Sequence, residues 1–232
     1  MKRFLSLIGV MVFSFPLQAA ETDVYDFSWL DQDKEVYVLQ NRKFRKKNQF
    51  YVGGTLGRSV SGAFIDSSEY NIIAGYFFAE DWGLEFTYTG AQGAKNKTYD
   101  AVSSQGSVAF FRQIDTATSA MLMWSPFYSK INTFNKIFYY DWMFGVGFIS
   151  AATSDNRKEF PGGSDSNQLT QEDVSGATWM TAFRFYINQD WSTRIDFRGT
   201  HLNADAAITG ESDTEKRWNN YYNFNVGLNY AF

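Results

Sequence analysis

A period of two runs through most of this chain, and it is clearest between residues 138 and 148. There, apolar and aromatic side chains fill every second position, while the positions between them carry Tyr139, Asp141, Met143 and two glycines. Successive side chains of a strand point to opposite faces, so this segment predicts a β-strand with one ring-rich face and one mixed face. Similar alternation marks seven more predicted strands, at 50–56, 70–76, 82–90, 120–124, 179–187, 194–198 and 222–232.

The connections between these eight predicted strands alternate in length. Only residues 79–81 and 188–190 separate two of the strand pairs, which indicates tight turns. Other connections are long, polar and rich in Gly, Ser, Asp and Asn, at residues 91–116, 150–173 and 201–217, with 59–67 as a shorter one. Short turns on one side and long loops on the other are typical of outer-membrane barrels. We therefore predict an all-β fold, an eight-stranded antiparallel up-and-down transmembrane β-barrel.

Charged side chains in mid-strand distinguish this barrel from a soluble β-sandwich or a lipocalin-like barrel, which also alternate. A soluble fold would have to expose the rings to water or bury the charges. In a membrane barrel the rings face lipid, the charges face the lumen, and closure satisfies every backbone group. The strand phases then predict a lumen charge network of three acidic and three basic residues: Glu85, Asp141, Asp196, Arg184, Arg194 and Arg198.

The chain also repeats itself, because residues 77–90 align with residues 186–199 at an offset of 109. Trp82 and Trp191 take matching positions at the turn exits, where we expect interfacial aromatics. The repeat also brings Glu85 and Arg194 into the same internal phase. Since side chains just fill an eight-stranded barrel, we predict a salt-bridged plug. The alternative is that the charges line a narrow solute channel.

The N-terminal residues have the order of an export signal. Lys2 and Arg3 precede an uncharged run that ends at Leu17, and the small residues Ala19 and Ala20 follow. We expect a signal peptide over residues 1–20, cleaved after Ala19 or Ala20. Residues 21–48 are then a periplasmic N-terminal extension, and residues 49–232 form the barrel. Localisation to the cell outer membrane, after export, is the consequence.

The last strand ends in an aromatic residue. A terminal aromatic that closes an alternating strand resembles the signal by which the barrel-assembly machinery recognises its substrates, so we expect that machinery as a partner during biogenesis. The residues of this predicted assembly signal are Phe224, Val226, Leu228, Tyr230 and Phe232.

Two further segments carry a family resemblance. Residues 35–54 hold a Gln-Asn-Arg run with a basic cluster before the opening strand, and residues 125–147 hold Ser-Pro, Tyr, Lys and Tyr-Asp landmarks. With the end strand, these segments resemble the myxobacterial-type outer-membrane β-barrel domain family, which is also found in Bdellovibrio-like bacteria. The resemblance covers most of residues 35–232. It implies an outer-membrane barrel and no established activity.

The basic cluster of residues 42–47 allows two interpretations. Placed just before the first strand, it could contact lipid phosphates or an anionic partner. A solvated basic lead-in that aids assembly is the interpretation we favour. The chain has 21 basic and 25 acidic residues and a net charge of −4, which argues against a nucleic-acid partner. The basic cluster consists of Arg42, Lys43, Arg45, Lys46 and Lys47.

Catalytic and metal sites find little support in the sequence. The chain has no Cys and one His, which excludes thiol nucleophiles and imidazole-rich metal sites. His201 is followed by Leu202 and Asn203, so the His and Ser of lipid A deacylases are absent, and its pairing with Asp205 is too sparse for an aspartyl protease. Acidic residues of the third long loop could gather Ca²⁺ but lack calcium-loop spacing, at Asp155, Asp165, Asn167, Glu172 and Asp173.

These observations predict an integral outer-membrane barrel with a structural or interaction role, displaying its long loops, and without catalytic activity or a cofactor. After residue 20 the longest charge-free run has 15 residues, which is too short for a spanning helix of ~20 residues. The alternative function is a narrow porin-like channel or a small-solute binding barrel. Outer-membrane lipid is the expected surrounding, and a ligand of the outer loops remains unassigned.

Overall fold

The computed structural model describes residues 42–133, 136–159, 169–206 and 216–232, and residues from Arg42 onward form one compact unit. The predicted signal peptide and residues 21–41 of the predicted extension lie outside the described residues. Every strand is antiparallel to its neighbours in sequence. The described strands are β1 (Gln49–Ser59), β2 (Ile65–Phe77), β3 (Trp82–Lys95), β4 (Arg112–Thr133), β5 (Lys136–Asp155), β6 (Thr170–Tyr186), β7 (Trp191–Asp205) and β8 (Lys216–Ala231).

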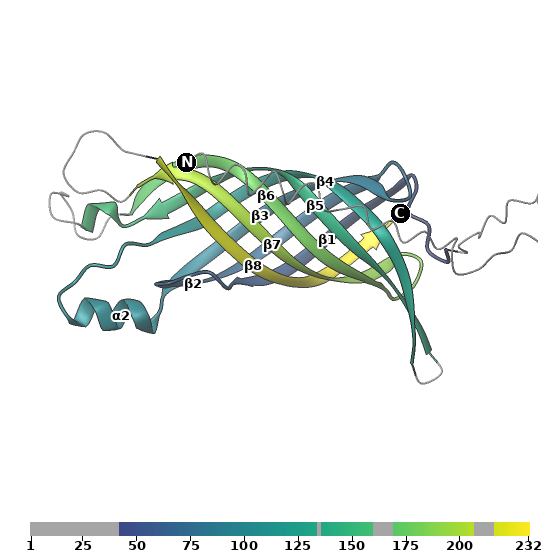
Figure 1. The fold of residues 1–232 in the computed structure, drawn as a ribbon, viewed down its shortest axis with the longest axis horizontal. Coiled ribbons are helices and arrows are strands. Elements are labelled where there is room, and N and C mark those ends of the chain that lie inside the picture. The colour runs from purple at the N-terminus through teal and green to yellow at the C-terminus, as the bar shows by residue number, and fades with distance from the viewer. Residues whose placement is uncertain (1–41, 134–135, 160–168, 207–215) are drawn as a thin grey trace, which may run out of the picture. The chain divides into compact units, whose positions relative to one another are not determined.

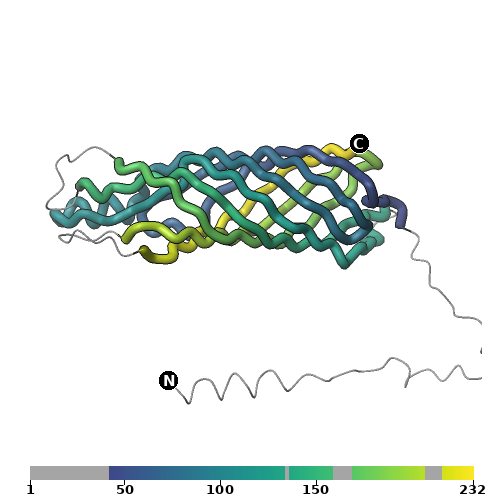
Figure 2. The backbone as a smooth tube through the Cα atoms, turned by 90° about the horizontal axis from the view of Figure 1, so that it is seen from above, coloured from purple at the N-terminus to yellow at the C-terminus, as the bar shows by residue number. Residues whose placement is uncertain are grey.

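The sheet closes on itself because the last strand pairs with the first. The β1–β8 register runs from Tyr51↔Ala231 to Ser59↔Asn223, which completes the ring β1-β2-β3-β4-β5-β6-β7-β8. Figures 1 and 2 show the strands winding obliquely around the barrel. Closure removes both sheet edges and so satisfies the backbone polar groups of the strands. The predicted fold class is therefore confirmed.

The barrel has two dissimilar ends. At the turn end lie the connections 78–81 and 187–190, the segment Arg42–Asn48 that precedes β1, and the C-terminal Phe232. At the loop end lie the connections 60–64 and 96–111, the short 3₁₀ helix η2 (Arg157–Glu159) and the helix α2 (Lys97–Ser104) (Figure 1). The short turns therefore lie at one end of the barrel and the longer connections at the other, as the alternating connection lengths predicted.

Several strands are longer than the alternation predicted, and part of one predicted loop is helical. β3 continues to Lys95, and Asn96 then caps α2 by accepting hydrogen bonds from the backbone N–H groups of Thr98 and Tyr99. Side-chain capping of this kind satisfies donors that a helix start leaves free. The period of two could not indicate this helix, which has only eight residues and one buried side chain, Tyr99.

β4 and β5 extend beyond the barrel at the turn end. The pairing of β4 with β3 starts at Trp82↔Trp124, whereas its pairing with β5 continues through a bulge to Thr133↔Lys136. Residues 125–133 and 136–141 therefore form a hairpin that projects past the other turns (Figure 1). Alternation alone did not predict this extension, because the β-bulge after Trp124 shifts the phase of the strand.

The two faces of the sheet differ in burial. Outward-facing rings such as Phe86 and Phe224 expose 58% and 47% of their surface, whereas inward-facing residues are mostly buried. Inward glycines make room for neighbouring amides: a Cβ at Gly57 would collide with the side chain of Asn225 across the β1–β8 pair. Within the described residues, no helix has the length and apolar character needed to cross a membrane. An apolar outer face around a polar interior is typical of a transmembrane barrel.

Candidate functional site

The turn-end half of the barrel interior holds a network centred on Arg194 of β7. Its Nη1 and Nη2 donate to Oε2 and Oε1 of Glu85 at 2.5 and 3.0 Å, and its Nε donates to Oδ2 of Asp196 at 3.1 Å. Glu85 Oε2 also accepts from the Tyr51 hydroxyl at 2.6 Å, and Asp196 Oδ1 accepts from Asn225 Nδ2 at 3.0 Å. We call these five residues the central network.

Burial makes the central network energetically important. The side chains of Arg194, Glu85 and Asp196 are all 0% exposed. Charges removed from water are tolerated only when the geometry is good and the remaining polar atoms are bonded, as the two-pronged Arg194–Glu85 contact achieves. The network therefore spans the interior from β3 to β7 and on to β8, and it fixes those strands relative to one another.

A second buried ion pair closes the turn end. Lys46, from the segment before β1, is 0% exposed, and its Nζ donates to Asp141 Oδ2 at 2.9 Å and to Ser125 Oγ at 2.6 Å. Asp141 Oδ2 also accepts from the Tyr186 hydroxyl at 2.5 Å. Phe44 stacks on the Tyr186 ring at 4.5 Å. The segment preceding the first strand thus enters the barrel mouth, and we call these five residues the turn-end plug.

Arg42 attaches the same segment to the β2–β3 turn. Its Nη1 donates to Asp81 Oδ1 at 2.8 Å and to Glu80 Oε1 at 3.4 Å. Partial burial lowers the pKa of Arg42, but the hydrogen bond and charge of Asp81 outweigh it and raise the pKa overall. Tyr128 of the projecting hairpin accepts from the backbone N–H groups of Lys43 and Phe44. The segment is therefore held on both sides.

Methionine side chains fill the interior in the same half of the barrel. Met121, Met123, Met143 and Met180 expose 2% or less of their surface and pack with Phe77 and other buried residues in one apolar cluster. Met has three rotatable bonds and a polarisable sulfur, so it fills irregular gaps well. Apolar packing therefore accompanies the ion pairs in this half.

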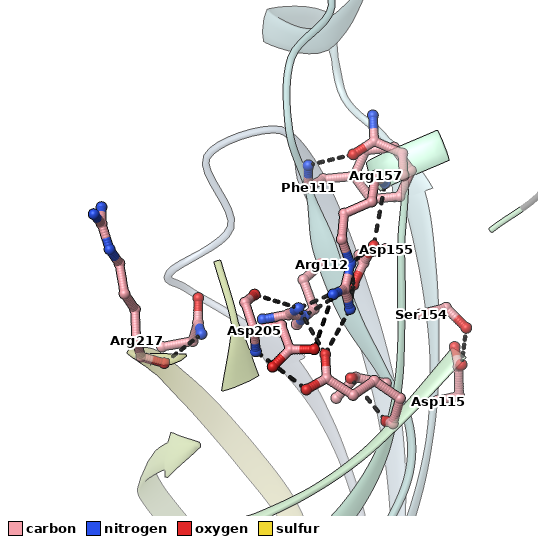
Figure 3. Close-up of polar contacts among 12 residues, drawn as sticks. Phe111, Arg112, Asp115, Ser154, Asp155, Arg157, Asp205 and Arg217 are labelled. Atoms are coloured by element: carbon pink, nitrogen blue, oxygen red, sulfur yellow. Dashed lines mark hydrogen bonds and ion pairs between the residues drawn. The ribbon is translucent and has the colours of Figure 1, made fainter. Parts of the chain in front are cut away.

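A third charged cluster lies at the loop end, shown in Figure 3. Arg112 Nη2 donates to Asp155 Oδ2 and to Glu172 Oε2, each at 2.9 Å. Arg157 Nη2 donates to the same two oxygens at 2.8 and 2.6 Å, and its Nη1 donates to Asp205 Oδ2 at 3.2 Å. The hydrogen bond to Asp155, together with the other carboxylates, raises the pKa of Arg157, so it stays charged. We call these five residues the loop-end cluster.

A cavity of about 210 Å³ lies beside this cluster, inside the loop-end mouth of the barrel. Its wall comes from the β1–β2 connection, from the start of β4 and from β8. Pairing of β3 with β4 stops at Gly90↔Thr116, so the sheet itself does not close this side of the mouth. Arg112 contributes to both the cluster and the cavity wall.

Comparisons with known proteins find only distant structural similarity. No family model and no curated protein matches the chain. Among solved structures, it is similar to the outer membrane protein OprG from Pseudomonas aeruginosa, with a TM-score of 0.43 and 13% identity over 82% of this chain and 98% of that one. Neisserial surface protein A has a TM-score of 0.45 and 12% identity over 78% of this chain and 95% of that one. The attachment invasion locus protein Ail of Yersinia pestis has a TM-score of 0.38 and 12% identity over 80% of this chain and 99% of that one.

The structure places all six residues of the predicted lumen network in the interior but does not join them all. Glu85, Arg194 and Asp196 belong to the central network, whereas Asp141 binds Lys46. Arg184 donates to Ser192 Oγ at 2.9 Å rather than to a carboxylate. Nε and Nη2 of Arg198 are buried without a hydrogen-bond partner among the described residues.

The predicted interfacial and C-terminal aromatics lie on the outer face. Trp82 is 41% exposed and stacks on Trp124 at 6.0 Å, and Trp191 is 44% exposed and contacts Tyr230 at 5.1 Å. The remaining residues of the predicted assembly signal also face outward on β8 or at its end, each 47% exposed or more: Phe224, Val226, Leu228 and Phe232.

Most of the described residues that were considered for catalysis or metal binding hydrogen-bond or ion-pair with other side chains. The Trp179 indole donates to His201 Nε2 at 3.0 Å, and Asn220 Oδ1 lies 2.7 Å from His201 Nδ1, on the outer face. Asp155, Glu172 and Asp205 bind arginines of the loop-end cluster, and Asp165 and Asn167 lie outside the described residues. Within the described ranges, no group of three or more acidic or His side chains is arranged to hold a metal ion.

The sequence patterns did not single out Arg112 and Arg157, and they placed Lys46 only in the basic cluster. A basic residue in a run of five basic residues suggests a solvated segment, yet Lys46 is the one that is fully buried. The favoured interpretation of the cluster as a solvated lead-in is therefore wrong for Lys46, which packs into the barrel mouth together with the neighbouring Phe44. No local pattern in the sequence indicates this docking, because Lys46 and its partner Asp141 are 95 residues apart.

Proposed function

We propose that this protein is an integral outer-membrane barrel with a structural or interaction role, which holds its loop end at the cell surface and does not catalyse a reaction. The observation that carries this proposal is the filling of the interior. The turn-end plug, the methionine cluster and the central network adjoin one another, with Lys46, Asp141, Glu85 and Arg194 all 0% exposed. Such an interior suits a rigid anchor better than the narrow channel that is its alternative.

The lengths of the connections indicate how the barrel would be oriented in the outer membrane. Barrels of the outer membrane keep short turns in the periplasm and long loops outside. The turn end would therefore face the periplasm, and α2 and the loop-end cluster would face the exterior. Lipid would contact the outward rings, and the barrel-assembly machinery would read the outward-facing aromatic residues of β8.

The absence of cysteine allows a direct test of this orientation. Asp100→Cys on exposed α2 should react with a membrane-impermeant maleimide in intact cells, whereas Asn188→Cys in the exposed β6–β7 turn should react only after the outer membrane is permeabilised. Reaction of Asn188→Cys in intact cells, or protection of Asp100→Cys, would contradict the orientation.

Closure of the interior needs its own test. Liposomes that contain the refolded protein should swell in small sugars no faster than empty liposomes. Rapid, size-dependent swelling would favour the channel.

Deletion of Phe232 should lower the amount of assembled barrel in the outer membrane while export continues, because the terminal aromatic would be the recognised feature.

A further inference from the structure

The projecting hairpin of β4 and β5 has two free edges. The ladder between β3 and β4 ends at Trp124, and the ladder between β5 and β6 begins only at Tyr140. Beyond these residues, the two strands of the hairpin pair with each other. A two-stranded hairpin is at best marginally stable in water, so contacts on its two faces have to support it.

The segment before β1 supports the inner face of the hairpin. The Tyr128 hydroxyl accepts from the backbone N–H groups of Lys43 and Phe44 at 3.2 and 3.4 Å. On the other strand of the hairpin, the Tyr139 ring lies 5.4 Å from the Phe44 ring and stacks on the Tyr128 ring at 6.0 Å. The inner face is therefore covered by the chain itself.

The outer face of the hairpin is apolar and exposed. Phe127, Ile131 and Phe138 lie on this face and are between 46% and 50% exposed. The register places them on the same side as Trp142, whose ring contacts those of Phe127 and of Phe183 on β6. Phe183 belongs to the outward-facing surface of the barrel. The outer face of the hairpin therefore directly continues the apolar surface that is turned toward lipid.

The register also gives the depth of this outer face. Following paired residues once around the ring leads from Trp82 to Gln92 on the same strand, so each step across the sheet climbs toward the loop end. With a rise of about 3.3 Å and a tilt of roughly 40°, one residue advances ~2.5 Å along the axis and one step climbs ~3 Å. Phe144 is two steps from Trp82, and Phe138 lies six residues beyond Phe144, which places Phe138 about 9 Å past Trp82.

This depth corresponds to the lipid headgroups. Trp82 lies at a turn exit, where interfacial rings mark the edge of the hydrocarbon. The headgroup layer beyond that edge is roughly 5–8 Å thick, so Phe138 lies near its outer limit. Figure 1 shows the hairpin leaning away from the barrel axis, which carries it beside the surrounding lipid rather than across the barrel mouth.

Positive charge accompanies the apolar face. Two exposed lysines belong to the hairpin and three exposed cations to the segment before β1: Lys130, Lys136, Lys43, Arg45 and Lys47. The acidic groups of the β2–β3 turn pair with Arg42, and Asp141 is buried with Lys46. Cations beside an apolar face are typical of surfaces that bind at a membrane interface, where they contact lipid phosphates.

We propose that the projecting hairpin is a membrane contact at the turn end of the barrel. Its outer face packs against the phospholipids of the adjacent leaflet, and Lys136, on the same face, contacts their phosphates. The orientation proposed above would make this the periplasmic leaflet. The contact itself depends neither on that orientation nor on whether the lumen conducts.

Two adjacent residues on opposite faces of the hairpin supply matched labelling sites. Phe138 faces outward and Ile137 inward, they are 49% and 51% exposed, and the chain has no Cys. Each is replaced by Cys in the full-length protein, labelled with bimane and placed in phosphatidylcholine nanodiscs, which leave both barrel ends open to buffer. Phosphatidylcholine with a nitroxide near its headgroup should quench Phe138→Cys at least about threefold more strongly than Ile137→Cys, and iodide should quench Ile137→Cys more strongly.

The remaining outcomes of this experiment each overturn the proposal. Strong iodide quenching at both sites would mean that the outer face stands in water. Protection of Phe138→Cys from iodide without quenching by the spin-labelled lipid would mean that protein covers the face, either a second copy or the residues before Arg42. Ile131→Cys lies on the same face and repeats the measurement if Phe138→Cys does not fold.

The lysine has a separate test, in nanodiscs that also contain phosphatidylglycerol. Spin-labelled phosphatidylglycerol should quench the Phe138→Cys label about twofold more than spin-labelled phosphatidylcholine at the same content, and Lys136→Gln should remove most of this preference. Lys216→Gln, which removes an exposed lysine at the loop end, should leave the preference unchanged. An equal loss in both variants, or no preference before the substitution, would contradict the phosphate contact. The maleimide and liposome-swelling tests do not depend on these outcomes, so failures of the two proposals remain distinguishable.

Discussion

The two ends of the barrel interior both carry ion pairs, but they bury them to different extents. At the turn end and in the centre, Lys46, Asp141, Glu85 and Arg194 have side chains that are 0% exposed. At the loop end, Arg112 and Asp155 are also buried, with side chains 2% and 0% exposed, but Arg157 and Asp205 keep 19% and 23% of theirs exposed, and a cavity lies beside the cluster. The difference separates a filled half, which holds the strands together, from a mouth that keeps a cavity and partly exposed ion pairs.

The largest effect is expected at the centre of the filled half. Arg194→Ala leaves Glu85 and Asp196 buried without their cation, and should lower the free energy of unfolding by about 3–5 kcal/mol. Urea unfolding in lipid vesicles measures this loss. The double variant Arg194→Met with Glu85→Gln should recover part of it. If the double variant were less stable than Arg194→Ala, packing rather than charge would explain the effect.

The outer face should respond almost as strongly to a charge. Phe86→Arg places a cation where a ring is now 58% exposed, and near mid-membrane this should cost about 2–4 kcal/mol. Phe86→Leu serves as the control and should cost far less in the same vesicle assay. Equal stability of the two variants would mean that residue 86 does not face lipid.

A smaller loss is expected at the loop end. Arg157→Ala removes charged hydrogen bonds to Asp155, Glu172 and Asp205, which should cost about 1.5–3 kcal/mol at most, since solvent screens part of the cluster. Lys158→Ala, at the next residue of η2, is the matched control and should stay within error of the unmodified protein. A loss in Arg157→Ala as large as in Arg194→Ala would remove the contrast between the two ends.

The smallest effect is expected on the exposed rim. Arg58 and Asp66 form an ion pair at 3.0 Å, but their side chains are 68% and 52% exposed. Exposed pairs contribute about 0–1 kcal/mol, so Arg58→Ala should hardly change the unfolding midpoint. A shift that disappears in high salt would still agree with this assignment, whereas a large salt-independent shift would not.

Sequence patterning could predict the barrel and the strand phases because both depend on local alternation. Glu85 and Arg194 fell on the inner face through the period of two, and the structure pairs them across 109 residues. Lys46 and Asp141 are 95 residues apart, and Lys46 lies outside any strand, so no phase could link them. Arg112, Asp155 and Glu172 meet only through the register of β4, β5 and β6, together with a bulge near Asp115, which a single sequence does not reveal.

We propose that the filled half seals the barrel, and single-channel recording in planar bilayers tests this seal most directly. The unmodified protein should show few or no openings, and Arg194→Ala should show more frequent ones, because the central network is broken while the barrel remains inserted. Steady, well-resolved openings of the unmodified protein would contradict the seal and identify the barrel as a channel.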